Sequence, residues 1–174
     1  MKLKSAICGA LMVAASASAS ANLVTNGDFS TNTCAGWTLT GNTGFNSCSS
    51  GFWNNGAVGS QAFLSQVIAT VAGQLYHVSF DAQTNSGFTI SGLLDGSQFI
   101  DTGGTGGQWV HFDVDVVAAN NNATLTFSNR NDPSFNYLDN VVVNAVPEPG
   151  TLALSALALM GIAGLRRRKN NLSV

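Results

Sequence analysis

Hydrophobic and polar residues alternate one by one along the middle of this chain. In residues 108–116 the apolar positions are Val110, Phe112, Val114 and Val116, and residues 75–82 repeat the pattern with Tyr76, Val78, Phe80 and Ala82. Successive side chains of a β-strand point to opposite faces, so each segment is predicted to be a strand with one face in the core and the other in water. In the first segment the wet face carries Trp109, His111, Asp113 and Asp115.

Six further runs predict strands, at residues 37–40, 62–68, 88–94, 97–101, 123–129 and 137–144. Asp95-Gly96 lies between two of them and predicts a tight hairpin turn, because both residues tolerate a positive φ. No stretch of this middle part has convincing helical spacing. About eight such strands bury enough surface only by stacking two sheets, so we expect an all-β, jelly-roll-type antiparallel β-sandwich, with a closed barrel as the alternative.

The first 21 residues have the composition of a signal peptide. Lys2 and Lys4 precede an apolar run at 6–15, and the small residues Ala19-Ser20-Ala21 form a cleavage site before Asn22. The alternative is a buried N-terminal helix, which would need polar positions at helical spacing, and the run has none. Residues 22–145 are then the exported domain.

The other end of the chain, residues 146–169, has three parts. Two prolines in Pro147-Glu148-Pro149 end regular pairing, residues 151–165 carry no charge, and a basic end follows at Arg166, Arg167, Arg168 and Lys169. An apolar helix over 151–165 would span about 22 Å, enough for a membrane with snorkelling basic flanks. The cations would stay on the cytoplasmic side. A buried core helix and a permanent anchor are the alternatives.

Charge and cysteine content narrow the function of the middle domain. The chain carries seven Lys and Arg residues, but Arg130 alone lies between the end segments, against eight aspartates, so residues 22–146 have a net charge of 1 − 8 = −7. Nucleic acid is therefore excluded as a partner.

Cys8 leaves with the signal peptide, and Cys34 and Cys48 are predicted to form a disulfide worth roughly 3 kcal/mol in an oxidising compartment. A metal site or a catalytic thiol fits the two cysteines less well.

The tail resembles the PEP-CTERM sorting signal at Pro147-Glu148-Pro149, along the apolar span from Leu152 and at the arginine-rich end. This resemblance implies processing by an exosortase, a membrane-embedded cysteine transpeptidase whose substrates are made alongside exopolysaccharide. The chain would then be an inner-membrane-anchored precursor that reaches the cell envelope, the cell surface or the extracellular matrix, with a link to biofilm. The tail indicates where the chain goes rather than what its domain does.

The domain is similar to carbohydrate-binding modules of the galactose-binding-like jelly-roll type at residues 22–29, at Trp37 and at 137–141. In such modules the first and last strands lie side by side, and a structural calcium is often held there. The resemblance implies Asp28 and Asp139 as calcium ligands. Ser30 departs from the family, because a glutamate commonly stands at that position, and calcium needs six to eight oxygens.

Carbohydrate recognition would use an exposed aromatic ring and neighbouring polar groups. Trp53, Trp109 and Tyr137 are the candidates, together with Phe135, and Trp109 shares its predicted face with His111 and Asp113. Burial of each ring in the sandwich is the alternative.

Catalysis is not expected, because neither histidine belongs to a nucleophile motif and Asp113 and Asp115 share one strand face. Two functions stay open for the domain, a sugar-binding module and a structural matrix component without a discrete ligand.

Overall fold

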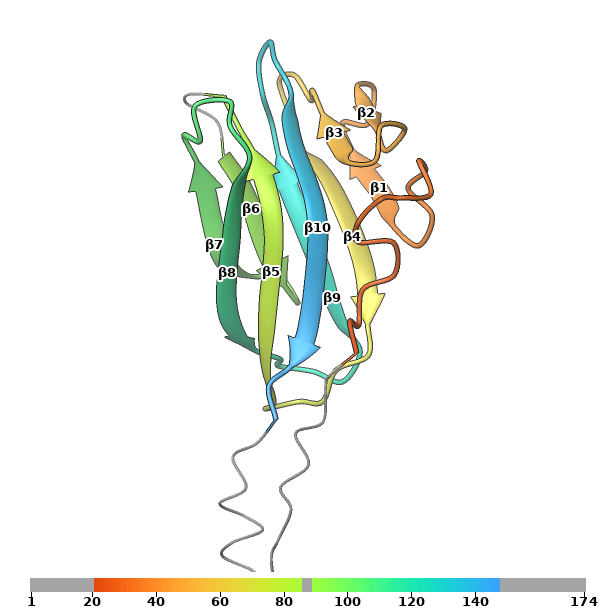
Figure 1. Cartoon of the computed structure of the whole chain (residues 1–174), viewed down its shortest axis with the longest axis vertical. Helices are drawn as coiled ribbons and strands as arrows, with labels where there is room; N and C mark the ends of the chain where they lie inside the picture. Colours follow the sequence, from red (N-terminus) through yellow and green to blue (C-terminus); the bar gives the residue numbers. More distant parts are fainter. Residues whose placement is uncertain (1–20, 86–88, 148–174) are drawn as a thin grey trace, which may run out of the picture. The chain divides into compact units, whose positions relative to one another are not determined.

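The computed structural model describes residues 21–85 and 89–147. Within them two antiparallel five-stranded sheets face each other (Figure 1). In spatial order, one sheet contains β1 (Thr38–Gly41), β4 (Ala62–Ile68), β9 (Ala123–Asn129), β6 (Thr89–Leu94) and β7 (Ser97–Gly103). The other contains β2 (Asn46–Ser47), β3 (Trp53–Asn55), β10 (Asn136–Ala145), β5 (Leu75–Gln83) and β8 (Val110–Val117). The predicted all-β sandwich is confirmed, and the barrel alternative is wrong because each sheet keeps two open edges.

The predicted strands agree closely with those observed. The strands at 62–68 and 123–129 have the predicted bounds, and the Asp95-Gly96 turn joins β6 to β7 with φ values of 50° and 79°. Sequence reading missed β2 and β3, which have two and three residues and lie in a segment rich in Asn, Gly and Ser. Phe88, the predicted start of β6, lies outside the described residues.

The core between the sheets is built around aromatic rings. The centroid of the Phe127 ring lies 5.1 Å from that of Phe80 and 6.5 Å from those of Trp37 and Phe99. Phe80 and Phe127 are fully buried. Burying one such side chain contributes about 1.5–3 kcal/mol, so this cluster is a main source of the stability of the sandwich.

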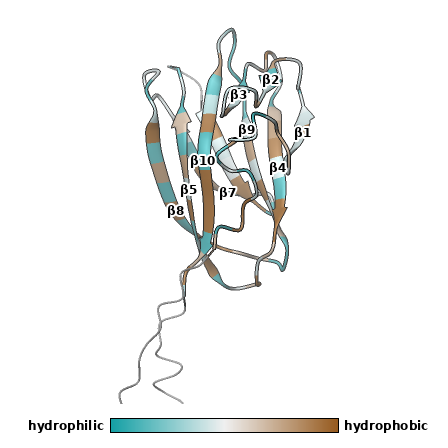
Figure 2. Cartoon of the chain, turned by 45° about the vertical axis from the view of Figure 1, so that its right-hand side comes forward, coloured by the Kyte–Doolittle hydropathy of each residue, from teal (hydrophilic) through white to brown (hydrophobic). Residues whose placement is uncertain are grey.

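The inward side chains of strand β8 are less buried than the sequence predicted. Its apolar side chains point inward as expected, and hydrophilic and hydrophobic bands alternate along it in Figure 2. Phe112, Val114 and Val116 are only partly buried, however, and Val110 is 37% exposed. The reason is that β8 forms the edge of its sheet and has a neighbour, β5, on one side alone.

The start of the described chain is bound to its last strand. Leu23 N donates to Val143 O at 2.9 Å, and Val141 N donates to Gly27 O at 2.9 Å. The contact is so close that a Cβ on Gly27 would lie 2.0 Å from Val141 O. The two ends of the domain therefore leave the same end of the sandwich (Figure 1), as the resemblance to carbohydrate-binding modules implied.

Predictions for the two end segments fall largely outside the described residues. Of the signal peptide only Ala21 is described, and of the sorting tail only Val146 and Pro147. Glu148, Pro149, the apolar segment 151–165 and the basic end 166–169 are not described. Among residues 21–85 and 89–147 there is no helix long and apolar enough to cross a membrane.

Candidate functional site

The outward side of β10, β5 and β8 carries polar side chains in rows that cross the strands; we call it the polar face. Its rows follow from the strand register. Asp139 lies beside Asp81 and Asp81 beside His111; the next rows are Val142, Ser79 and Asp113, then Asn144, His77 and Asp115. Because alternate residues of each strand point into the core, these side chains all project from one surface.

Two histidine–aspartate pairs on the polar face join β5 to β8 in opposite senses. His111 Nδ1 of β8 lies 2.6 Å from Asp81 Oδ1 of β5, and His77 Nδ1 of β5 lies 2.7 Å from Asp115 Oδ1 of β8. The second oxygen of Asp81 accepts a hydrogen bond from Asn140 Nδ2 at 2.7 Å. These pairs fix the imidazole rings on the surface, where both histidines remain exposed.

Three aromatic rings close one end of the polar face. The Phe52 ring lies 5.3 Å from that of Tyr137 and 5.9 Å from that of Trp109, and Trp109 lies 6.3 Å from Tyr137. Phe52 meets both neighbours edge-on, a favourable arrangement for aromatic pairs. Trp109 is 45% exposed, whereas Phe52 and Tyr137 are partly buried. The three rings, which we call the aromatic cluster, therefore form a fixed hydrophobic platform beside the polar rows.

Trp53 is not part of this platform, and the prediction that it contacts a ligand is wrong. Its side chain points into the core and is fully buried. The indole Nε1 donates to Asn46 Oδ1 at 3.0 Å, so even its polar atom is satisfied inside the protein. The physical reason is the register of β3, which places Trp53 opposite the buried Leu138. Phe52 directly precedes the strand and is only partly buried.

Phe135 lies at a different place, in a small apolar pocket of about 280 Å³ among the loops. Phe45, Val58 and Pro133 line the same pocket. The Phe135 ring packs directly on Gly56, where a Cβ would lie 2.5 Å from it. This pocket is thus separate from the aromatic cluster.

The predicted calcium ligands Asp28 and Asp139 lie near the bulge of β10. Partial burial raises the pKa of Asp139, and the charges of Asp81 and Asp28 raise it further, against a hydrogen bond from Asn140 N at 2.7 Å. The pKa of Asp28 is lowered, chiefly by the hydrogen bond from Ser30 N. A shallow pocket of about 290 Å³ lies beside them, lined by residues that include Gly27, Asp28 and Asn140.

This arrangement does not fit calcium well. Calcium takes six to eight oxygen ligands. Within the described ranges no group of three or more His, Cys, Asp or Glu side chains could hold a metal ion. Both oxygens of Asp81 are already engaged by His111 and Asn140. Calcium at Asp28 and Asp139 stays a prediction.

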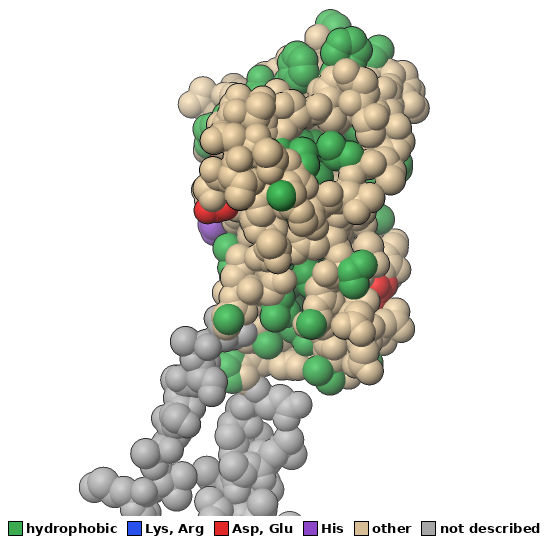
Figure 3. Space-filling model, turned by 90° about the vertical axis from the view of Figure 1, so that its right-hand side faces the viewer, with side chains coloured by type: hydrophobic (Ala, Val, Ile, Leu, Met, Phe, Trp, Pro, Cys, Tyr) green, Lys and Arg blue, Asp and Glu red, His purple; other side chains and the backbone are tan. Residues whose placement is uncertain are grey.

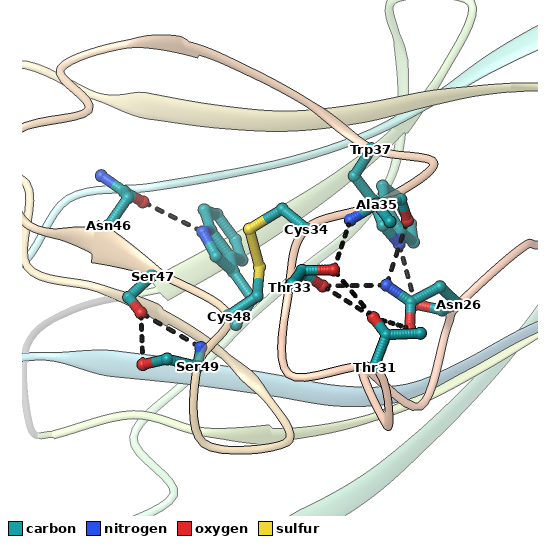
Figure 4. Close-up of a disulfide and its surroundings, with 11 residues drawn as sticks. Asn26, Thr31, Thr33, Cys34, Ala35, Trp37, Asn46, Ser47, Cys48 and Ser49 are labelled. Carbon is teal, nitrogen blue, oxygen red and sulfur yellow. Dashed lines mark hydrogen bonds between the residues drawn. A yellow bond between two sulfur atoms is a disulfide. The ribbon is translucent and has the colours of Figure 1, made fainter.

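The predicted disulfide between Cys34 and Cys48 is present and ties the N-terminal loop to the segment before β3 (Figure 4). Asn26 organises the same loop. Its Nδ2 donates to Thr33 O and Ala35 O, and its backbone carbonyl accepts from Trp37 Nε1 at 3.0 Å. This Gly- and Asn-rich segment buries few apolar side chains, so the disulfide and the hydrogen bonds of Asn26 hold it in place instead.

Sequence reading missed three members of the site, namely Phe52, Asp81 and Asn140. Alternation alone placed Asp81 and His77 on a wet face, but not beside His111 and Asp115, because the pairing of β5 with β8 joins residues 30 and 38 positions apart. Asn140 reaches Asp81 because it adopts a positive φ of 51° at the bulge of β10. An Asp-Asn pair inside an alternating run was the available signal for such a bulge.

Comparison with known families shows what the tail is. Residues 145–169 match the PEP-CTERM protein-sorting motif. The motif marks an exported protein and implies processing by an exosortase. No curated protein sequence matches the chain.

Comparison with solved structures shows the fold of the domain. The carbohydrate-binding module TmCBM61, solved with β-1,4-galactotriose, is 18% identical with a TM-score of 0.55, and the match covers 73% of this chain and 100% of that module. The N-terminal cellulose-binding domain of β-1,4-glucanase C from Cellulomonas fimi is 18% identical with a TM-score of 0.51, covering 74% and 100%. The enzymatically active domain of tailspike protein 4 from bacteriophage CBA120 is 16% identical with a TM-score of 0.55; the match covers 72% of this chain but 21% of that one. The described domain is therefore similar in fold to carbohydrate-binding-module jelly rolls.

Proposed function

We propose that this chain is an exported protein of the cell envelope or extracellular matrix whose domain binds a polysaccharide on the polar face. One observation carries the proposal: an aromatic cluster with an exposed tryptophan closes one end of a row-wise array of carboxylate, amide and imidazole groups. The match to the sorting motif and the likeness in fold to carbohydrate-binding modules support it. An exosortase is the proposed processing partner, and exopolysaccharide is the proposed class of ligand, which would place the protein in biofilm.

In this proposal Trp109 is the ring on which a sugar stacks. It is the most exposed ring of the aromatic cluster, while Phe52 and Tyr137 hold it from the side. A sugar has an apolar face made of C–H groups and hydroxyls around its rim, so it needs a hydrophobic platform with polar neighbours. Asp81 and His111 in the next row are the groups that would bind the hydroxyls.

The dimensions of the polar face suit a chain rather than a single sugar. From the row of Tyr137 to the row of Asn144 there are three steps of two residues, or about 20 Å at roughly 3.4 Å per residue.

The domain of residues 22–146 is a suitable sample, because its hydrophobic core and the hydrogen bonds of its two ends are all contained in it. We would measure its retardation in affinity gels that contain soluble polysaccharides, with Trp109→Ala and Phe45→Ala as a matched pair. Phe45 is a more exposed ring, at 61%, and belongs to the separate loop pocket. We expect retardation to be lost in Trp109→Ala and kept in Phe45→Ala. No retardation by any polysaccharide would favour a structural matrix role without a discrete ligand.

A further inference from the structure

The polar face carries a concentration of negative charge. Asp81, Asp113, Asp115 and Asp139 project from it, which is half of the eight aspartates between residues 22 and 146. Asp28 is close enough that its charge raises the pKa of Asp139. An acidic surface of this kind repels anions and attracts cations over several ångströms.

No fixed positive charge offsets these carboxylates. Arg130 is the single Lys or Arg among residues 21–85 and 89–147, and it lies beyond β9 of the other sheet. There its Nε pairs with Asp132 Oδ2 at 3.0 Å and its Nη1 donates to Gly59 O. The side of the molecule seen in Figure 3 likewise shows acidic and histidine surface but no Lys or Arg. Among the described residues the ion pairs reach Asp81, Asp115 and Asp132, and none reaches Asp113 or Asp139.

The acidic rows adjoin the aromatic cluster. Tyr137 and Asp139 are alternate residues of β10, and their neighbours on β5 are Gln83 and Asp81. A cation bound at Asp139 would therefore lie one row from aromatic rings, whose faces attract positive charge.

From these observations, and resting on the proposed function, we infer that the polysaccharide bound by the polar face is an amino-sugar polymer with free ammonium groups. An ammonium donates three hydrogen bonds and carries the charge that the face lacks, and hydrogen bonds between charged partners are the stronger kind. Asp113 and Asp139 are the carboxylates that would receive it. The same charges disfavour polymers of uronic acid or sulfated sugars as ligands.

The test compares glycans of positive, neutral and negative charge. The probes are a glucosamine oligomer with free amines, the same oligomer fully N-acetylated, and an oligogalacturonate, titrated into the 22–146 domain by calorimetry below the pH at which the amines lose their protons. We expect the free-amine oligomer to bind at least about fivefold more tightly than its acetylated form. We also expect that preference to shrink as salt is raised, and the galacturonate not to bind.

Variants test whether the preference for the free-amine oligomer arises on the polar face. Asp113→Asn and Asp139→Asn are expected to reduce it, whereas Asp101→Asn is a matched control because Asp101 lies on β7 of the opposite sheet. Circular dichroism checks that each variant is folded. Binding of the acetylated oligomer as tight as that of the free amine, lost in Trp109→Ala, would overturn this inference and leave the proposed function intact. Absence of binding by all three oligomers and by every polysaccharide of the gel assay would overturn both.

Discussion

Asn22 Oδ1 accepts a hydrogen bond from Val143 N at 3.0 Å, so the first residue after the predicted signal-peptide cleavage site is bound to the last strand of the domain. The same side chain also accepts from Val24 N at 3.0 Å. Cleavage before Asn22 would thus leave both of these hydrogen bonds in place.

The first prediction concerns this asparagine. Replacing Asn22 by alanine removes both of these hydrogen bonds and a third, longer one that Asn22 Nδ2 donates to Val141 O at 3.4 Å. It also leaves Val143 N without its acceptor, and the change should lower the free energy of unfolding by about 1–3 kcal/mol. Urea denaturation of the 22–146 domain measures the change. Ser60→Ala at an exposed loop position is the control and should leave the midpoint unmoved. Equal midpoints for the two variants would show that the side chain of Asn22 adds nothing to stability.

The second prediction concerns the disulfide. Cys34 and Cys48 are 14 positions apart, and closing such a loop stabilises the folded state by about 3 kcal/mol in the chain-entropy model. A Cys34→Ser, Cys48→Ser double variant should therefore melt at a lower temperature than the oxidised domain. Reductant should lower the melting temperature of the native sequence and leave that of the double variant unchanged. A native sequence insensitive to reductant would contradict the prediction.

The third prediction is a pH dependence at Asp139. Its folded-state pKa is raised, first by burial and then by Asp81 and Asp28, so the folded domain holds this proton more tightly than the unfolded chain does. Ionisation of Asp139 therefore costs stability as pH rises through the raised pKa, and the cost is absent below the ordinary value of 3.8. Asp139→Asn should stabilise the domain at neutral pH and have little effect at about pH 3.

Urea denaturation at the two pH values tests it without added metal. The amide of the variant can still accept the hydrogen bond that Asn140 N donates, so the substitution mainly removes charge. Asp101→Asn, on the opposite sheet, is the control and should show no such pH-dependent gain. A destabilising effect of Asp139→Asn at neutral pH would contradict the stated cause of the shift.

The fourth prediction concerns the sorting motif. Replacing Pro147, Glu148 and Pro149 together by alanine should block exosortase processing, because the resemblance assigns recognition to these residues. The unprocessed chain should then accumulate in the membrane fraction, which immunoblotting of cell fractions detects. A triple variant of the domain, Ser60→Ala, Ser97→Ala and Gln98→Ala, at three exposed positions is the control. If the variant were processed and released normally, this tripeptide would not be the recognition element.

The fold was largely predictable because alternation is a local property. Tyr76, Val78, Phe80 and Ala82 are buried as predicted, since a central strand is covered on both edges and its inner face must be apolar. Edge strands have the same alternating pattern, but their inward side chains are less buried. For this reason Val110 was predicted to lie in the core and is instead partly exposed. Alternation cannot show how many neighbours a strand has.

The site was predicted only in part because it depends on register. Trp109 and Tyr137 were recognised as candidates, but their partner Phe52 directly precedes the three-residue strand β3, which no sequence pattern marks. Trp53 next to it is buried because β3 pairs Trp53 with Leu138, a contact between residues far apart in the chain. Cross-strand pairing, and not residue type, decides which of two adjacent aromatic residues faces solvent.

The most direct test of the account is to map the binding surface by nuclear magnetic resonance. The 22–146 domain, labelled with ¹⁵N, is titrated with the polysaccharide that retards it most in the affinity gel. We predict that the indole signal of Trp109 and the amides of Gln83, His111 and Tyr137 shift together and saturate. Shifts confined to Phe45, Val58 and Phe135 of the loop pocket, or no shifts on the polar face, would contradict it.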